Sequence, residues 1–322
     1  MTARQPAQRS DPAGAGLIVL AAICFGTLGP LSRFAEDAGV GSLALVAWRA
    51  GIGAAVMAIF IAVRLATGRT QPLSLARIPV RDRWFMVAAA VANTVLNLSV
   101  FVAFNRISIA LALLLFYLYP AFVALVSVIW FGERLDRLRW AALGVSFTGL
   151  VLVLAGTEGG IGTVDALGVG LAFVGGLAQV FYVLAARHGF GHVPGAQAAA
   201  LTMGGAMTLY VLIALVTGSA AVLATPVASS GALWPVLVAG IVGAGVPTVA
   251  YIVGIRRLGP SRAAILAMLE PVVGVLLAAW LLAEQPTLVQ LAGGALIIVA
   301  AVLLQVRRRV AVADHEAVAD PE

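Results

Sequence analysis

The chain has 322 residues, of which 62% are hydrophobic and 11% are charged, and its mean hydropathy is +1.05. This composition lies outside the range of soluble globular proteins and predicts an all-α integral membrane protein. The net charge of +6 does not indicate a nucleic-acid partner, because all 20 basic residues are arginines scattered through short segments between apolar runs.

Ten apolar runs are long enough to cross a hydrocarbon core of roughly 30 Å as helices. The run after Arg4 and Arg9 lacks a convincing cleavage site, so we interpret it as a retained helix. The flanking segments 1–14 and 307–322 are predicted to be a disordered N-terminus and a C-terminal tail. The expected spans are 15–34, 42–63, 84–104, 107–131, 139–155, 166–186, 196–217, 232–254, 261–283 and 288–306.

The arginines predict the orientation of these spans. With the N-terminus in the cytoplasm, 17 arginines fall on the cytoplasmic side, and only Arg33 and Arg106 fall on the other. Arg49 lies inside the second span, where snorkelling or pairing with a carboxylate is favoured over binding an anionic substrate. The pattern predicts a multi-pass protein of the cell membrane with both termini in the cytoplasm.

Two stretches of the chain are similar at a fixed offset of 151 residues, which indicates a duplicated unit. The offset pairs Pro120 with Pro271 and Glu133 with Glu284. The units are predicted at 15–155 and 166–306, with five spans each. An odd number of spans places the two copies in opposite orientations in the bilayer, an arrangement typical of solute transporters.

Glu270 is the carboxylate expected nearest the middle of a span. A charge at that depth costs about 2.5–3.5 kcal/mol on insertion scales, so Glu270 should face protein or water. Pro271 removes a backbone hydrogen bond beside it, so the helix should bend there. Glu270 fits a ligand for a substrate amine or a proton carrier, and a structural salt bridge or a neutral hydrogen-bonded side chain is an equal alternative.

Other polar residues occur on single faces of apolar spans. The 151-residue offset relates Tyr119 to Glu270 and Asn97 to Thr248. Residues three or four apart share a helix face. For any one of them an interhelical hydrogen bond of roughly 0.6 kcal/mol is the favoured explanation, and their clustering favours a hydrated cavity. The candidate substrate-binding residues are Asn93, Asn97, Tyr119, Gln179, Tyr182, Thr248, Tyr251 and Glu270.

Four further residues are assigned structural roles. Pro120 and Pro271 should bend their helices, and Glu133 and Glu284 should pair with arginines or helix starts at the ends of their spans. We expect no metal or cofactor, because the three histidines lie in a loop and a tail and the chain has one cysteine. No phosphate-binding glycine loop follows a strand, so an enzyme is not expected.

The sequence resembles the EamA-like family of the drug/metabolite transporter superfamily over residues 15–306. The resemblance rests on Val102–Pro120 and Phe131–Leu135 in the first half and on Leu269–Gly274 and Leu281–Glu284 in the second. It implies ten helices in two inverted five-helix repeats around a central cavity, and movement of small metabolites, often outward. It does not imply a particular substrate. Asn105-Arg106 and Ala283 depart from the residues usual in the family.

These observations lead to one functional hypothesis and two alternatives. The first is a secondary transporter of amino acid-like solutes or drugs that works by alternating access as an exporter, with membrane lipids and protons as further partners. The second is a membrane enzyme acting on lipid-linked substrates, which would need clustered acids or histidines at one interface. The third is a membrane partner protein that transports nothing. The sequence leaves the substrate, the direction of transport, the coupling ion and the oligomeric state open.

Overall fold

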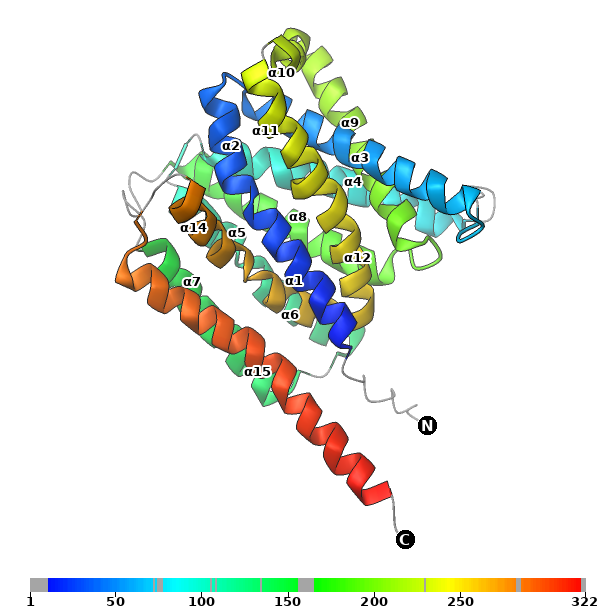
Figure 1. The fold of residues 1–322 in the computed structure, drawn as a ribbon, viewed down its shortest axis with the longest axis vertical. Helices are drawn as coiled ribbons and strands as arrows, with labels where there is room; N and C mark the ends of the chain where they lie inside the picture. Colours follow the sequence, from blue (N-terminus) through cyan, green and yellow to red (C-terminus); the bar gives the residue numbers. More distant parts are fainter. Residues whose placement is uncertain are drawn as a thin grey trace.

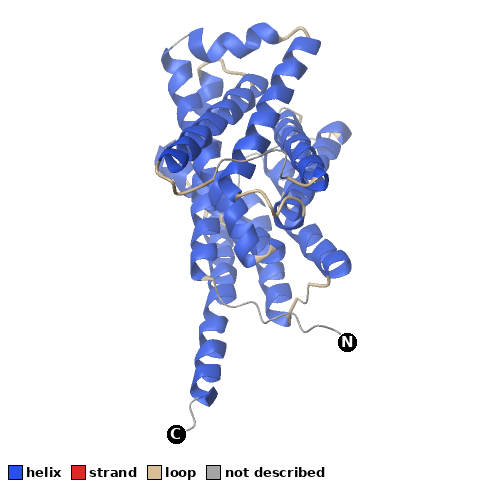
Figure 2. Ribbon diagram, turned by 90° about the vertical axis from the view of Figure 1, so that its right-hand side faces the viewer, coloured by secondary structure: helices blue, strands red, loops and turns tan. Residues whose placement is uncertain are grey.

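The computed structural model describes residues 11–71, 73, 78–104, 106–107, 109–133, 135–155, 165–228, 230–281 and 285–319. All regular elements within them are helices (Figures 1 and 2). In chain order these are α1 Pro12–Gly26, α2 Leu28–Asp37, α3 Ser42–Ala66, α4 Val80–Phe104, α5 Ile109–Phe116, α6 Tyr119–Phe131, α7 Arg137–Ala155, α8 Ala166–His188, α9 Gly195–Val216, a 3₁₀ helix Ala220–Ala224, α10 Thr225–Ala228, α11 Ser230–Gly240, a π-helix Ile241–Gly245, α12 Val246–Leu258, α13 Pro260–Ala267, α14 Glu270–Leu281 and α15 Leu288–Ala319.

Nine of the helical segments in the described residues are long and apolar enough to span a membrane. They correspond to the first nine predicted spans. In the place of the tenth lies a shorter apolar helix, Leu288–Leu303, which is the first part of α15. Large apolar side chains such as Ile59, Trp130 and Trp280 are more than 60% exposed, as expected where lipid rather than water is the solvent.

Two of the predicted spans are broken near their middle. α5 ends at Phe116 and α6 begins at Tyr119, while α13 ends at Ala267 and α14 begins at Glu270. Each second segment has proline as its second residue, and proline cannot donate the helical hydrogen bond to the carbonyl four residues earlier. The ends of α5 and α6 can be paired with the ends of α13 and α14. In three of these four pairs the two ends are 151 residues apart: 109 and 260, 116 and 267, and 119 and 270.

The eighth predicted span also departs from one continuous α-helix. α11 and α12 are joined by the π-helical turn Ile241–Gly245, which contains Gly243 and Gly245 and is followed by Pro247. π-helical turns are rare and often mark functional sites. The hydrophobic pattern did not predict this turn, because an extra residue in one turn changes the helix geometry without changing the composition.

Each helix break packs against a glycine of another helix. A Cβ at Gly26 of α1 would lie 3.1 Å from the Glu270 carbonyl oxygen and 2.8 Å from Val273 Cβ. A Cβ at Gly176 of α8 would lie 3.0 Å from the Phe116 carbonyl oxygen. Glycine therefore lets the first helix of each predicted unit approach the break in the other unit closely.

α7 and α15 lie side by side at one edge of the molecule (Figure 1). Gly149 of α7 faces Gly293 of α15, and a Cβ at either position would lie 2.5 Å from the other residue's carbonyl oxygen. α15 continues past the predicted end at residue 306 to Ala319. α1 begins at Pro12, and its start lies at the same end of the molecule as the end of α15 (Figures 1 and 2).

Asp165 caps the start of α8. Its carboxylate accepts hydrogen bonds from the backbone N–H groups of Leu167 and Gly168, both at 3.3 Å, and from Arg106 at 3.0 Å. The Arg106 hydrogen bond is the main cause that lowers the pKa of Asp165 below its usual 3.8. A lowered folded-state pKa means that the cap stabilises the protein above the unfolded-state pKa and that this contribution is lost as the pH falls.

We therefore expect Asp165→Ala to lower the thermal unfolding temperature slightly at pH 7. The difference from wild type should shrink as the pH falls below the unfolded-state pKa, because the wild-type carboxylate is then increasingly protonated. Thermal unfolding in detergent at several pH values measures this. Asp165→Asn, which keeps an acceptor oxygen for the cap, serves as the matched control, and equal losses for both variants would contradict the capping role.

Candidate functional site

Glu270 is the first residue of α14 and lies directly after the break. A carboxylate here is favoured by the partial positive charge of the helix N-terminus. The Tyr117 hydroxyl, which lies in the break between α5 and α6, donates a hydrogen bond to Glu270. The two broken helices therefore meet through their breaks, and Glu270 is only partly buried there.

A second chain of hydrogen bonds lies beside this contact. The Tyr119 hydroxyl, at the start of α6, donates to the Tyr251 hydroxyl of α12. Tyr251 also accepts a hydrogen bond from the Gln179 amide of α8 at 3.4 Å. The rings of Tyr117 and Tyr119 are 6.0 Å apart between centroids, so the two chains of hydrogen bonds share one aromatic cluster. Phe25 of α1 closes the cluster edge-on against Tyr251.

A third group comes from α3, α4 and α9. Arg49 of α3 donates a hydrogen bond to the side-chain amide oxygen of Asn97 on α4. The Asn97 amide donates to Asn93, to its backbone oxygen at 2.8 Å and its side-chain oxygen at 3.0 Å. Asn97 is also hydrogen-bonded to Tyr210 of α9. Arg49 and Glu270 attract each other electrostatically, which connects this group to the first one.

The structure thus brings together six of the eight candidate substrate-binding residues. These six are Asn93, Asn97, Tyr119, Gln179, Tyr251 and Glu270. Thr248 lies one turn from Tyr251 but makes no hydrogen bond to the cluster within the described residues. Tyr182 is buried and is hydrogen-bonded to Thr202 of α9 instead.

The sequence did not single out Tyr117 as a site residue, and for Arg49 it favoured snorkelling or pairing with a carboxylate. Tyr117 lies two residues before Tyr119, and its position in the break was the available signal. Arg49 neither snorkels outward nor forms an ion pair within the described residues, because its guanidinium is held by Asn97 inside the protein. The spacing of residues along one helix cannot predict a hydrogen bond between side chains of α3 and α4.

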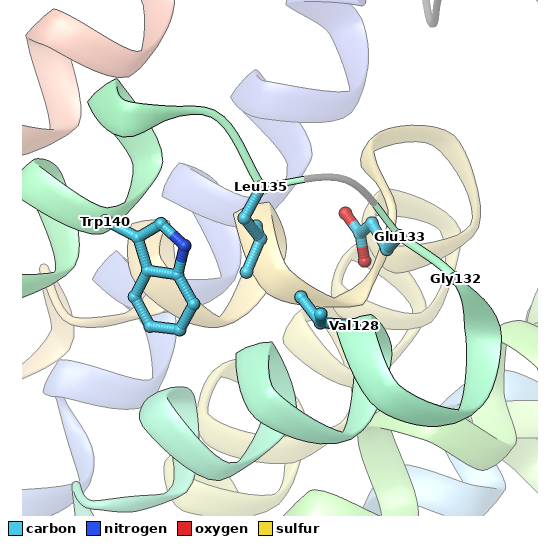
Figure 3. A pocket seen from close by; sticks show the side chains of 5 residues that line it. All are labelled: Val128, Gly132, Glu133, Leu135 and Trp140. Atoms are coloured by element: carbon cyan, nitrogen blue, oxygen red, sulfur yellow. The ribbon is translucent and has the colours of Figure 1, made fainter.

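Glu133 lies away from this cluster, at a surface hollow of about 390 Å³ (Figure 3). The hollow is lined by Val128, Gly132, Glu133, Leu135 and Trp140. The Glu133 carboxylate accepts a hydrogen bond from Ser261 of α13 at 2.9 Å and pairs with Arg139 at 3.5 Å. These bonds join the end of α6 to the starts of α7 and α13. Glu284, the other predicted end residue, lies outside the described residues.

The cluster around Glu270 contains an acid, a guanidinium, four phenols and three amides on eight different helices or breaks. Such a set can bind a polar solute and can hold or transfer a proton at the Glu270 carboxyl group. Within the described residues no group of three or more histidine, cysteine or acidic side chains could hold a metal ion.

We expect Tyr117→Phe to slow transport by about 10-fold or more, because a hydrogen bond to a charged group is worth about 1.5–3 kcal/mol. Initial uptake rates in reconstituted vesicles measure this. Phe122→Leu on α6 is the control, because its ring contacts Phe173 rather than the tyrosines and the change removes no hydrogen bond. An unchanged rate for Tyr117→Phe would show that its bond to Glu270 has no role in transport.

Comparisons with known proteins agree with this architecture. The sequence profile described as the EamA-like transporter family matches residues 12–155 and 166–306. An uncharacterized transporter of Archaeoglobus fulgidus is 29% identical over 88% of this chain and 93% of its own length. An uncharacterized transporter of Synechocystis sp. is 25% identical over 63% of this chain and 61% of its own. One crystal structure has the same fold, with a TM-score of 0.77, 23% identity, and coverage of 93% of this chain and 99% of that one.

Proposed function

The chain belongs to the EamA-like transporter family, and from that premise we propose that it is a secondary active transporter of small organic metabolites. Its substrates are amino acid-like solutes or drugs. The protein works by alternating access and exports its substrate across the cell membrane, with both termini in the cytoplasm. The observation that carries the proposal is Glu270, held by Tyr117 where two broken helices meet.

Helix breaks suit a transport site for a physical reason. In both breaks the backbone N–H groups still bond to carbonyls of the preceding turn, as Leu118 does to Leu115 and Leu269 does to Leu266. Pro120 and Pro271, however, cannot donate to the carbonyls four residues earlier, and in a membrane such a carbonyl is satisfied by protein, water or ligand. A solute that enters can therefore replace water on polar groups that already exist.

Alternating access needs two parts that rock against each other. We propose that these are two inverted five-helix units, 15–155 and 166–306, with α15 supplying the tenth span. The 151-residue spacing of the two breaks supports duplication. The packing of α1 on the α14 break, and of α8 on the α5 break, supports an exchange of equivalent contacts between the units.

Efflux and uptake in reconstituted vesicles test this function. The full-length protein is placed in liposomes, and a panel of labelled amino acids, sugars and drugs is measured with and without a proton gradient. Saturable movement of at least one solute, absent from empty liposomes, is expected. A gradient-dependent rate would identify the proton as the coupling ion, and faster exit than entry would support export. Failure to move any solute would favour a partner protein without transport activity.

A further inference from the structure

Arg49 is a charged side chain that the structure keeps inside the helical assembly. It lies seven residues, or about 10 Å of helix, from the start of α3, and its side chain is only partly buried. A guanidinium at this depth is costly unless it is paired or serves a function. Arg49 therefore keeps some accessible surface while it is bonded to a neighbouring helix.

The hydrogen bonds of Arg49 leave much of its binding capacity unused. A guanidinium carries five N–H donors. Within the described residues the structure gives it one acceptor, the Asn97 side-chain oxygen. That acceptor is neutral, so it cannot balance the positive charge, and the nearby acid Glu270 acts on Arg49 through space without a direct bond.

Asn97 is itself fixed, and this determines where the guanidinium lies. Its amide nitrogen donates to Asn93, one turn earlier on α4, at 2.8 and 3.0 Å, and Asn97 is also hydrogen-bonded to Tyr210 of α9. The amide oxygen is therefore turned toward Arg49 and accepts from it. Asn97 acts as a positioning residue for Arg49.

Glu270, which carries the opposite charge, is also held by a neutral hydrogen-bond partner. Its carboxylate accepts from the Tyr117 hydroxyl, and it is also partly accessible. The site thus holds one positive and one negative group, each anchored by a neutral partner rather than by the other. A solute with a carboxylate and an ammonium group carries the complementary charge for each of them, and guanidinium groups bind carboxylates through paired N–H donors.

We propose that Arg49 is the subsite for the substrate carboxylate, so that the protein selects a zwitterion over a simple amine of the same shape. This inference rests on the proposed transport function and names the substrate class within it. Glu270 receives the ammonium group, and the aromatic cluster of Tyr117, Tyr119 and Tyr251 contacts the remainder of the solute.

Ligand-induced stabilisation of the purified full-length protein tests the proposal. The twenty common L-amino acids are the probes, and each one that raises the unfolding temperature is compared with its decarboxylated amine. We expect at least one amino acid to bind and its amine to bind about 10-fold more weakly or worse. This comparison uses the wild-type protein, so it does not depend on the folding of any variant.

Variants then assign the selectivity to the guanidinium. Arg49→Gln should weaken binding of the amino acid about 10-fold or more and leave binding of the amine unchanged, while Arg49→Lys should restore part of the difference. Arg64→Gln, at the exposed end of the same helix, is the matched control and should bind as wild type.

Three results would overturn the subsite. These are binding of no amino acid, equal binding of an amino acid and its amine, and unchanged selectivity in Arg49→Gln. A transported sugar or simple amine that is insensitive to Arg49 would overturn the subsite alone and leave the transport function standing. Absence of any transport would overturn both.

Discussion

Glu270→Gln is expected to abolish transport, with a fall of about 100-fold or more, while the protein remains folded in the membrane. Glutamine keeps the size of the side chain but removes its charge and its ability to carry a proton. Arg49 then loses its electrostatic partner, and Tyr117 donates to a weaker acceptor. A hydrogen bond to a charged acceptor is worth about 1.5–3 kcal/mol, and each 1.36 kcal/mol lost from the transition state slows a rate about 10-fold.

Initial rates of solute movement in proteoliposomes, with and without a proton gradient, measure the effect. Glu36→Gln is the matched control, because it makes the same chemical change on an exposed residue of α2 and should transport as wild type. Size-exclusion chromatography establishes that both variants are folded. If the flux of Glu270→Gln equals that of wild type over a range of pH, Glu270 is neither a ligand nor a proton site.

Gly149→Ala is expected to disrupt the packing of the helix pair α7 and α15 strongly. The new methyl group would lie 2.5 Å from the Gly293 carbonyl oxygen and 2.8 Å from Ile297 Cγ1. A backbone oxygen cannot rotate away as a flexible side chain can, so the two helices must separate. Overpacking of this kind costs about 1–3 kcal/mol, and the loss of the close approach adds to it.

Gly144→Ala on the same helix is the control, since nothing lies within 4 Å of a Cβ at that position. It should be neutral or slightly stabilising, because alanine favours helix over glycine by about 0.5–1 kcal/mol. Thermal unfolding of both variants in detergent measures the difference. Equal unfolding temperatures would mean that α7 and α15 do not pack through Gly149 in solution.

Hydrophobic runs and prolines were informative because their effects are local. Nine predicted spans correspond to long apolar helices, since any span must satisfy its own backbone hydrogen bonds. The bend expected beside Pro271 lies at the break before α14, and the 151-residue offset places a matching break before Pro120. The π-helical turn at Ile241–Gly245 had no comparable signal, because packing rather than composition selects it.

The candidate site was only partly predictable, because most of its contacts join side chains of different helices. Residues that share a helix face, such as Asn93 and Asn97, could be grouped from their spacing, and the structure shows them hydrogen-bonded. Thr248 was grouped by the repeat alone, and symmetry in sequence does not guarantee a shared contact. Tyr117 lies in a break, where the helical periodicity used to assign faces no longer applies.

The sequence by itself determined that this is a helical membrane protein with duplicated proline breaks and an acid beside one of them. These properties follow from composition and spacing along a single segment. Only the tertiary structure decided that Tyr117 bonds Glu270, that Arg49 is held by Asn97 and that Glu133 joins α6 to α13. Each of these contacts depends on how separate helices rotate and pack, and no single segment encodes that arrangement alone.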